Sequence, residues 1–185
     1  MREGSDPSEL DLSRPVERVL FRVEDSQEWE LLVPRTVYPP REDTLLLAQA
    51  LGTFRTKPGV AVEIGCGSGA ISIFLASLGW TVEAYDVNPM AVSTTRGNAQ
   101  SAGLSELISV GEGGLGEQGW DIPEEASLLV WNLPYLDPVE EGEMLEPIED
   151  ASMLDIVGGW SDVLLEKILH SKTLDECLVV LLHRT

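Results

Sequence analysis

Residues 62–70 read VEIGCGSGA, an apolar run that leads into three glycines spaced two residues apart. Glycines at such a place let the backbone turn sharply and let a ligand approach without a Cβ in the way, and a helix that begins there offers free N–H groups. The spacing is G-x-G-x-G, which differs from the G-x-G-x-x-G of dinucleotide-binding proteins and from the phosphate loop with its lysine. Because no basic residue lies beside the turn, we expect a ligand that carries a nucleoside without a pyrophosphate.

The chain around this turn alternates between strand and helix patterns. Apolar strands are predicted at residues 59–65, 81–86, 107–113, 127–134 and 176–185, and helices at 68–79, 88–103 and 159–170. Such alternation is typical of α/β proteins, in which helices cover both faces of a parallel sheet. We therefore predict a twisted, mostly parallel sheet.

The N-terminal part has a different pattern. Residues 1–36 are predicted to be an extension, in which 19–25 and 29–34 form a β-hairpin, and residues 37–185 form the α/β domain. Within that domain, residues 41–54 predict a helix with Asp43 or Thr44 as its cap and Gly52 at its end.

The charge of the chain is strongly acidic, with 32 acidic and 12 basic residues and a net charge of −20. Eight of the basic residues lie in 1–57, and none lies in 97–166. A phosphate backbone needs cations that replace its counterions, so the second half is a poor surface for nucleic acid. An acid-rich chain with three lysines also suits a halophilic protein, whose salt would screen the repulsion.

The sequence predicts a cytoplasmic protein without a membrane span or signal peptide, because it has no run of eighteen apolar residues and its N-terminus lacks an apolar stretch. Cys66 and Cys177 show no metal-ligand spacing, so we expect reduced thiols and no metal site.

Asp86 ends the second predicted strand, in EAYDVNP. An acid at this place can accept two hydrogen bonds from a ribose diol. It can also cap the following helix, although Asn88 is available as a cap. Ligands of open parallel sheets lie over the carboxyl ends of the strands, where Asn132 should emerge as well.

Residues 130–136 read VWNLPYL. Strand interiors disfavour Asn, and Pro134 cannot donate to a sheet ladder. An amide followed by a proline and an aromatic residue at the end of a strand therefore needs a functional explanation.

Together these segments resemble class I S-adenosylmethionine-dependent methyltransferases. VEIGCGSG resembles their first motif, YDVNP the second, and NLPY the Asn/Asp-Pro-Pro-Tyr signature of amino-methyltransferases. The stretch VYPPREDTLLLAQAL (37–51) is similar to HemK-like protein glutamine methyltransferases, especially the compact archaeal and eukaryotic branch that acts on the Gly-Gly-Gln loop of translation termination factors. The resemblance implies a Rossmann-like fold, whose C-terminal hairpin is missing here unless residues 19–34 substitute for it.

The resemblance also implies S-adenosylmethionine as cofactor. Asp43 and Thr44 would meet its methionine end, the glycine turn and Glu63 its amino-acid part, and Asp86 its ribose. Glu112 would contact the adenine by spacing, although the usual Asp-Leu pair is absent. The implied cofactor-binding residues are Asp43, Thr44, Glu63, Gly65, Cys66, Gly67, Gly69, Asp86, Asn88, Glu112 and Asn132.

The implied acceptor site consists of Asn132, Leu133, Pro134 and Tyr135. The Asn132 side-chain oxygen and the Leu133 carbonyl would accept hydrogen bonds from a planar NH2, orient it and stabilise the charge that develops on nitrogen. Pro134 keeps Leu133 extended, and Tyr135 offers a flat wall. Leu133 stands where the family commonly has a first proline.

The same signature serves protein glutamine, adenine N6 and guanine N2. Seven acids and no base lie between Asp137 and Asp150, which favours a protein acceptor, the glutamine of a translation termination factor. An RNA or DNA amino-methyltransferase, supported by the N-terminal arginines, and a non-catalytic methyltransferase-like subunit are the alternatives.

The resemblance further implies a heterodimer with a small zinc-binding activator. Trp80, Leu107 and Ile108 are candidates for its contact surface, or else ordinary core.

Overall fold

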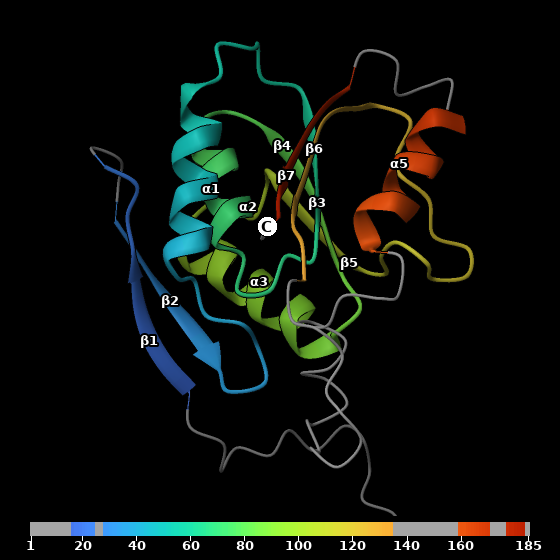
Figure 1. The fold of residues 1–185 in the computed structure, drawn as a ribbon. Helices are drawn as coiled ribbons and strands as arrows, with labels where there is room; N and C mark the ends of the chain where they lie inside the picture. Colours follow the sequence, from blue (N-terminus) through green and yellow to red (C-terminus); the bar gives the residue numbers. More distant parts are fainter. Residues whose placement is uncertain (1–15, 25–27, 135–158, 171–176, 184–185) are drawn as a thin grey trace, which may run out of the picture.

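The computed structural model describes residues 16–24, 28–134, 159–170 and 177–183. These residues form a two-stranded and a five-stranded sheet with helices packed around the larger one (Figure 1). Tyr135 and the acidic segment 137–150 lie outside the described residues. The elements are β1 (Val16–Phe21), β2 (Trp29–Pro34), α1 (Glu42–Thr53), β3 (Val60–Ile64), α2 (Ala70–Ser77), β4 (Thr81–Asp86), α3 (Pro89–Ser101), β5 (Ile108–Glu112), β6 (Ala126–Asn132), α5 (Trp160–His170) and β7 (Leu178–Leu182).

The five-stranded sheet has the order β5-β4-β3-β6-β7, and all its neighbouring strands are parallel. The chain steps outward from β3 through β4 to β5 and then returns to β6 on the other side of β3. This reversal creates a switch point between β3 and β6, where open α/β sheets bind their ligands. The predicted Rossmann-like α/β fold is confirmed.

Side chains of the central strands alternate between two apolar cores, because successive residues of a strand point to opposite faces. Ala61 packs with the residues of α1, α2 and α3, whereas Val62 and Ile64 pack with Leu164 of α5. In Figure 1 the first three helices lie on one side of the sheet and α5 on the other. Helices therefore cover both faces, as predicted.

Helix α1 differs from its prediction at both ends. Its N-cap is Arg41, and the hydroxyl of Thr44 accepts a hydrogen bond from the Arg41 backbone N–H at 3.2 Å. Asp43 and Thr44 thus lie within the first turn. Gly52 lies inside the last turn, because the helix continues to Thr53 and its C-cap is Phe54. None of the helices in the described ranges is long and apolar enough to cross a membrane.

The N-terminal segment forms an antiparallel hairpin, although its first strand, Val16–Phe21, lies earlier than the predicted 19–25. β1 and β2 pair antiparallel from Val16 opposite Pro34 to Phe21 opposite Trp29. Alternate residues of β2, which are Trp29, Leu31 and Val33, are buried, and the strand packs against α3. The alternative in which residues 19–34 substitute for the C-terminal hairpin of the family is wrong, because β1 and β2 form a sheet of their own.

Two of the three residues proposed for an activator contact belong to the core. Trp80 is 6% exposed and Ile108 is 7% exposed, and both pack with α2 and α3 residues. Leu107 is partly buried against the same core. Since the isolated chain already covers these side chains, the ordinary-core interpretation is the correct one for Trp80 and Ile108.

The Asn98 side chain joins the hairpin to the glycine turn. Its Oδ1 accepts from the Leu32 N–H at 2.9 Å, and its Nδ2 donates to the carbonyls of Leu32 at 3.1 Å and Ser68 at 2.9 Å. Asn98 is buried, so its removal leaves backbone groups without partners.

We predict that Asn98→Ala lowers the free energy of unfolding by roughly 2–4 kcal/mol, the cost of several unmade buried hydrogen bonds. Urea denaturation measures this difference. The control is Gln100→Ala, an exposed position on the same helix. Equal midpoints for the two variants would contradict the role of Asn98.

Candidate functional site

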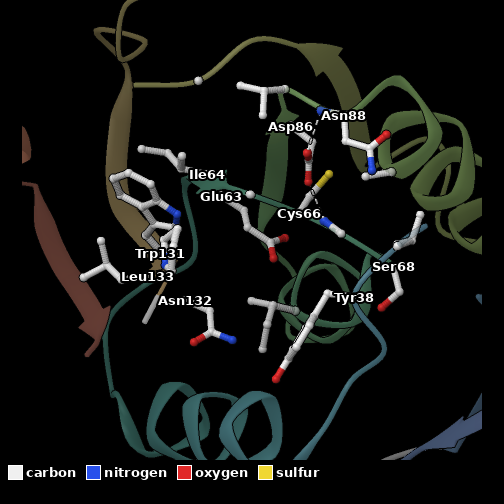
Figure 2. A pocket seen from close by; sticks show the side chains of 18 of the residues that line it. Tyr38, Glu63, Ile64, Cys66, Ser68, Asp86, Asn88, Trp131, Asn132 and Leu133 are labelled. Atoms are coloured by element: carbon white, nitrogen blue, oxygen red, sulfur yellow. Dashed lines mark hydrogen bonds between the residues drawn. The ribbon is translucent and has the colours of Figure 1, made fainter. Parts of the chain in front are cut away.

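Three polar side chains emerge on the same face of the sheet, at the carboxyl ends of its three central strands. Glu63 of β3 lies opposite Ala84 of β4 and Val130 of β6. Asp86 and Asn132 each follow these partners by two residues, so all three side chains point toward the α1–α3 side. Figure 2 shows them around one opening.

The glycine turn needs its glycines for backbone conformation and for space. Gly65, Gly67 and Gly69 have φ values of 69°, 53° and 82°, a region that residues with a Cβ rarely adopt. A Cβ on Gly69 would lie 2.9 Å from the Thr95 side chain. The N–H groups of Gly65 and Cys66 donate to the Tyr85 carbonyl at 2.8 and 3.0 Å, which fastens the turn to β4.

Asp86 is held by two backbone donors. Its Oδ2 accepts from the Gly67 N–H and its Oδ1 from the Asn88 N–H, both at 2.9 Å. Burial raises the pKa of the Asp86 carboxyl, while the hydrogen bonds from Asn88 and Gly67 oppose that rise. Each oxygen keeps a further lone pair, so the carboxylate has capacity for two hydroxyl donors.

Asn88, not Asp86, is the N-cap of α3. Its Oδ1 accepts from the Met90 N–H at 2.9 Å, and its Nδ2 donates to the Thr36 carbonyl at 2.9 Å. The capping explanation for Asp86 is therefore not needed.

Glu63 is buried, and the Ser72 hydroxyl donates to its carboxyl group. Burial raises the pKa of Glu63 to about 8, and the charge of Asp86 adds to the rise while Ser72 opposes it. A cationic group in the cavity would favour the ionised form. Burial also raises the pKa of the Cys66 thiol, so the thiol stays protonated. Cys66 therefore lines the cavity and does not act as a nucleophile.

The amide of Asn132 has one paired end and one unpaired end. Its Nδ2 donates to Asp43 Oδ2 at 2.9 Å. Its Oδ1 is buried and has no hydrogen-bond partner among the described residues. The next residue, Leu133, donates its N–H to the Leu182 carbonyl at 3.1 Å, which extends the β6–β7 ladder past the end of β6.

The first turn of α1 closes the site opposite the sheet. Asp43 Oδ2 also accepts from the Tyr38 hydroxyl at 3.0 Å, and its Oδ1 accepts from the Thr44 N–H at 2.7 Å. The Arg41 guanidinium lies 5.5 Å from the centre of the Tyr38 ring. Residues 38–44 therefore connect to β6 through one carboxylate.

The structure gathers most of the predicted residues around one cavity. Those that line it are Thr44, Glu63, Gly65, Cys66, Gly67, Asp86, Asn88, Asn132, Leu133 and Pro134. Asp43 and Gly69 do not line it, but Asp43 holds Asn132 and Gly69 caps α2. Glu112 does not belong to the wall: it is exposed, and the chain after β5 lines the cavity instead. Tyr135 lies outside the described residues.

Sequence reasoning missed part of the lining, namely Tyr38, Leu115, Trp131 and Trp160. The rings of Trp131 and Trp160 lie 6.0 Å apart, and Leu115 belongs to the same apolar core. Trp131 precedes Asn132 in the quoted VWN stretch, but neither periodicity nor spacing indicates that Trp160 reaches the cavity.

These groups fit the cofactor that the sequence resemblance implies. Glu63 offers a carboxyl group to an ammonium, Asp86 offers two oxygens to a diol, and the glycine turn lets a flexible chain pass. Val87 and Leu115 add an apolar wall for a base. Within the described residues, no cluster of three or more His, Cys, Asp or Glu side chains could hold a metal ion.

Several known proteins are similar to this chain in sequence. The sequence profile of the tellurite resistance protein TehB family matches residues 48–111. A release factor glutamine methyltransferase from Dictyoglomus turgidum is 30% identical over 157 residues, which cover 82% of this chain and 56% of that protein. A ribosomal RNA small subunit methyltransferase C from Alcanivorax borkumensis is 39% identical over 72 residues, which cover 38% of this chain and 22% of that protein.

Solved structures agree on the fold. The hMettl16 catalytic domain, in complex with the MAT2A 3'UTR hairpin 1, matches with a TM-score of 0.56 at 20% identity, over 81% of this chain and 58% of that one. The chain spans between 22% and 56% of the length of the first curated relatives that it matches.

The raised pKa of Glu63 makes stability depend on pH. Between the usual glutamate value of about 4.3 and the folded value, the unfolded state ionises while the folded state stays protonated. Without cofactor, Glu63 should therefore lower the free energy of unfolding as pH rises from 5 to 8, by up to about 1.4 kcal/mol per unit.

Glu63→Gln removes this slope, whereas the exposed Glu106→Gln keeps it. Urea denaturation at pH 5, 6, 7 and 8 measures the slopes. Parallel profiles for wild type and Glu63→Gln would show that Glu63 does not titrate in this range.

Proposed function

The chain belongs to the class I S-adenosylmethionine-dependent methyltransferase family, and from this premise we propose that it methylates a planar NH2 nitrogen, the glutamine side-chain amide of the Gly-Gly-Gln motif in a translation termination factor. The observation that carries the proposal is the buried Oδ1 of Asn132, an acceptor without a partner among the described residues at the cavity wall. A buried unpaired acceptor is costly, and an incoming N–H donor would satisfy it.

The cofactor is S-adenosylmethionine, which supplies, when bound, a methyl group from its sulfonium. The acceptor nitrogen would take this methyl group and lose one of its own protons. Glu63 would hold the ammonium of its amino-acid part, and Asp86 would hold the ribose diol. The glycine turn between them keeps the path of the ligand free of side chains.

Asn132 and Leu133 would orient the acceptor. An amide nitrogen has its lone pair conjugated, so it must be held while it becomes tetrahedral. Asn132 Oδ1 and the Leu133 carbonyl are two oxygens that can each accept one N–H of an NH2 group. Because Asn132 is neutral, it orients the nitrogen and stabilises its growing positive charge rather than removing a proton.

Two features favour a protein acceptor. The similarity to the release factor glutamine methyltransferase covers 82% of this chain, whereas the similarity to the ribosomal RNA enzyme covers 38%. The residues that follow the acceptor motif carry seven acids between Asp137 and Asp150 and no base, which disfavours a polyanion.

An activator subunit belongs to the same proposal. In the described part of the sheet, β5 is an edge strand, so one of its sides has no strand partner there. An edge strand presents unpaired backbone N–H and C=O groups, which proteins commonly cover, and a small zinc-binding protein would cover them here.

The decisive experiment incubates the protein with labelled S-adenosylmethionine in high salt, with and without such an activator. One arm contains a termination factor with its Gly-Gly-Gln motif and the other contains RNA. We expect label on the factor, and none after the motif glutamine is changed to alanine. Label on RNA alone would replace the glutamine proposal by the nucleic-acid alternative. Cofactor binding without transfer in either arm would favour the non-catalytic subunit.

We predict that Asn132→Ala lowers kcat by at least about 100-fold, the typical effect of removing one group that stabilises charge in the transition state. Cofactor affinity should change by no more than about threefold, because the carboxylates that hold the cofactor remain. Single-turnover transfer and calorimetric titration measure the two quantities, with exposed Glu125→Gln as control. Equal losses in both would make Asn132 part of the scaffold instead.

We predict that Asp86→Ala raises the cofactor Kd by about 10- to 100-fold, since charged hydrogen bonds to the ribose are lost. Calorimetric titration with S-adenosylmethionine measures the change. Thr81→Ala, at the other end of β4, is the control and should bind as the wild type does. An unaltered Kd for Asp86→Ala would remove Asp86 from the ribose site.

A further inference from the structure

The side chain of asparagine has two ends of similar shape and opposite chemistry. Its oxygen accepts hydrogen bonds, and its NH2 donates them. An acceptor NH2 can be oriented by Asn132 only if the oxygen faces it. The protein therefore needs a device that distinguishes the two ends of this amide.

Asp43 is such a device, because an ionised carboxylate accepts hydrogen bonds and donates none. Its Oδ2 lies 2.9 Å from Asn132 Nδ2. With the amide reversed, Asn132 Oδ1 would face the carboxylate oxygen, so that an attraction becomes a repulsion. Loss of one charged hydrogen bond disfavours the reversed amide by roughly 10- to 100-fold.

Four hydrogen bonds fix the position of the Asp43 carboxylate. Oδ2 accepts from Asn132 and from the Tyr38 hydroxyl at 3.0 Å, and Oδ1 accepts from the Thr44 N–H at 2.7 Å and the Thr44 hydroxyl at 3.2 Å. A carboxylate has about four acceptor positions, and these four donors fill them.

This saturation argues against direct contact of Asp43 with the cofactor, which the sequence resemblance implies. The residue is also absent from the cavity wall, whereas its neighbour Thr44 is part of it. The hydrogen bonds of Asp43 therefore suit the orientation of the Asn132 amide. Donors among the described residues occupy its acceptor positions, so none is left for a ligand ammonium.

We propose that Asp43 is a positioning residue that locks the Asn132 amide with its oxygen toward the acceptor, so that helix α1 sets the polarity of the acceptor site. The proposal rests on the proposed function for the role of Asn132 in transfer, but the lock itself exists in the free protein.

Asp43→Asn should reverse the lock. The Thr44 N–H demands an acceptor, so the oxygen of the new amide stays beside Thr44 and its NH2 faces Asn132. Asn132 then turns its own oxygen inward and its NH2 toward the acceptor. We expect kcat to fall about 10- to 100-fold while the cofactor Kd stays within about twofold. Glu42→Gln, exposed and adjacent on α1, removes the same charge and should leave both values unchanged.

The charge-swapped pair provides the sharpest readout. Asn132→Asp alone places two carboxylates against each other and should lose activity. Combined with Asp43→Asn, the new carboxylate at position 132 accepts from the amide at 43 and presents its second oxygen to the acceptor. We expect the double variant to recover at least about 10-fold in kcat over either single variant, the scale of one charged hydrogen bond. A double variant no better than the worse single one would overturn the proposal.

A nuclear magnetic resonance measurement separates failure of this inference from failure of the proposed function. The side-chain NH2 of Asn132 should exchange slowly with solvent in the wild type and quickly in Asp43→Asn, whatever the acceptor is. If the wild type methylates no acceptor, the proposed function fails and this exchange difference still tests the lock. Equal exchange, wild-type kcat in Asp43→Asn, or equal loss of kcat and cofactor affinity would each overturn it.

Discussion

The carboxylate of Asp86 holds the candidate site together. Its two oxygens bind the N–H groups of Gly67 and Asn88, so the end of β4 fixes both the glycine turn and the start of α3. Asn88 in turn caps α3 and binds the Thr36 carbonyl, which ties the chain after the hairpin to the same point. Two crossovers and the N-terminal segment thus converge on one buried acid.

Two buried acids at one cavity explain what kind of ligand it suits. Glu63 and Asp86 both line it, Glu117 lines it as well, and no Lys, Arg or His appears among its described lining residues. Buried carboxylates without a cation are costly, which is why burial raises both pKa values. A ligand with an ammonium and a sulfonium supplies the missing positive charge, whereas a pyrophosphate would be repelled.

Residue spacing and strand alternation in the sequence predicted those parts of the site that neighbouring residues of the chain determine. The glycine turn and the strand-end acid follow from spacing, and strand alternation places Glu63, Asp86 and Asn132 on one face. Helix caps were less predictable, since Arg41 became the cap of α1 through the Thr44 side chain. Glu112 was misplaced because spacing along the chain does not show where the backbone leaves β5. The hydrogen bond from Asn132 to Asp43 joins residues 89 positions apart, and no sequence pattern indicates it.

The first turn of α1 connects the two halves of the proposed reaction. Thr44 lines the cavity, and its N–H binds the same Asp43 carboxylate that holds the Asn132 amide. A ligand that contacts Thr44 would therefore lie next to the carboxylate that orients Asn132. The cofactor end and the acceptor end of the cavity are thus connected through one carboxylate, and no movement of the sheet is needed to link them.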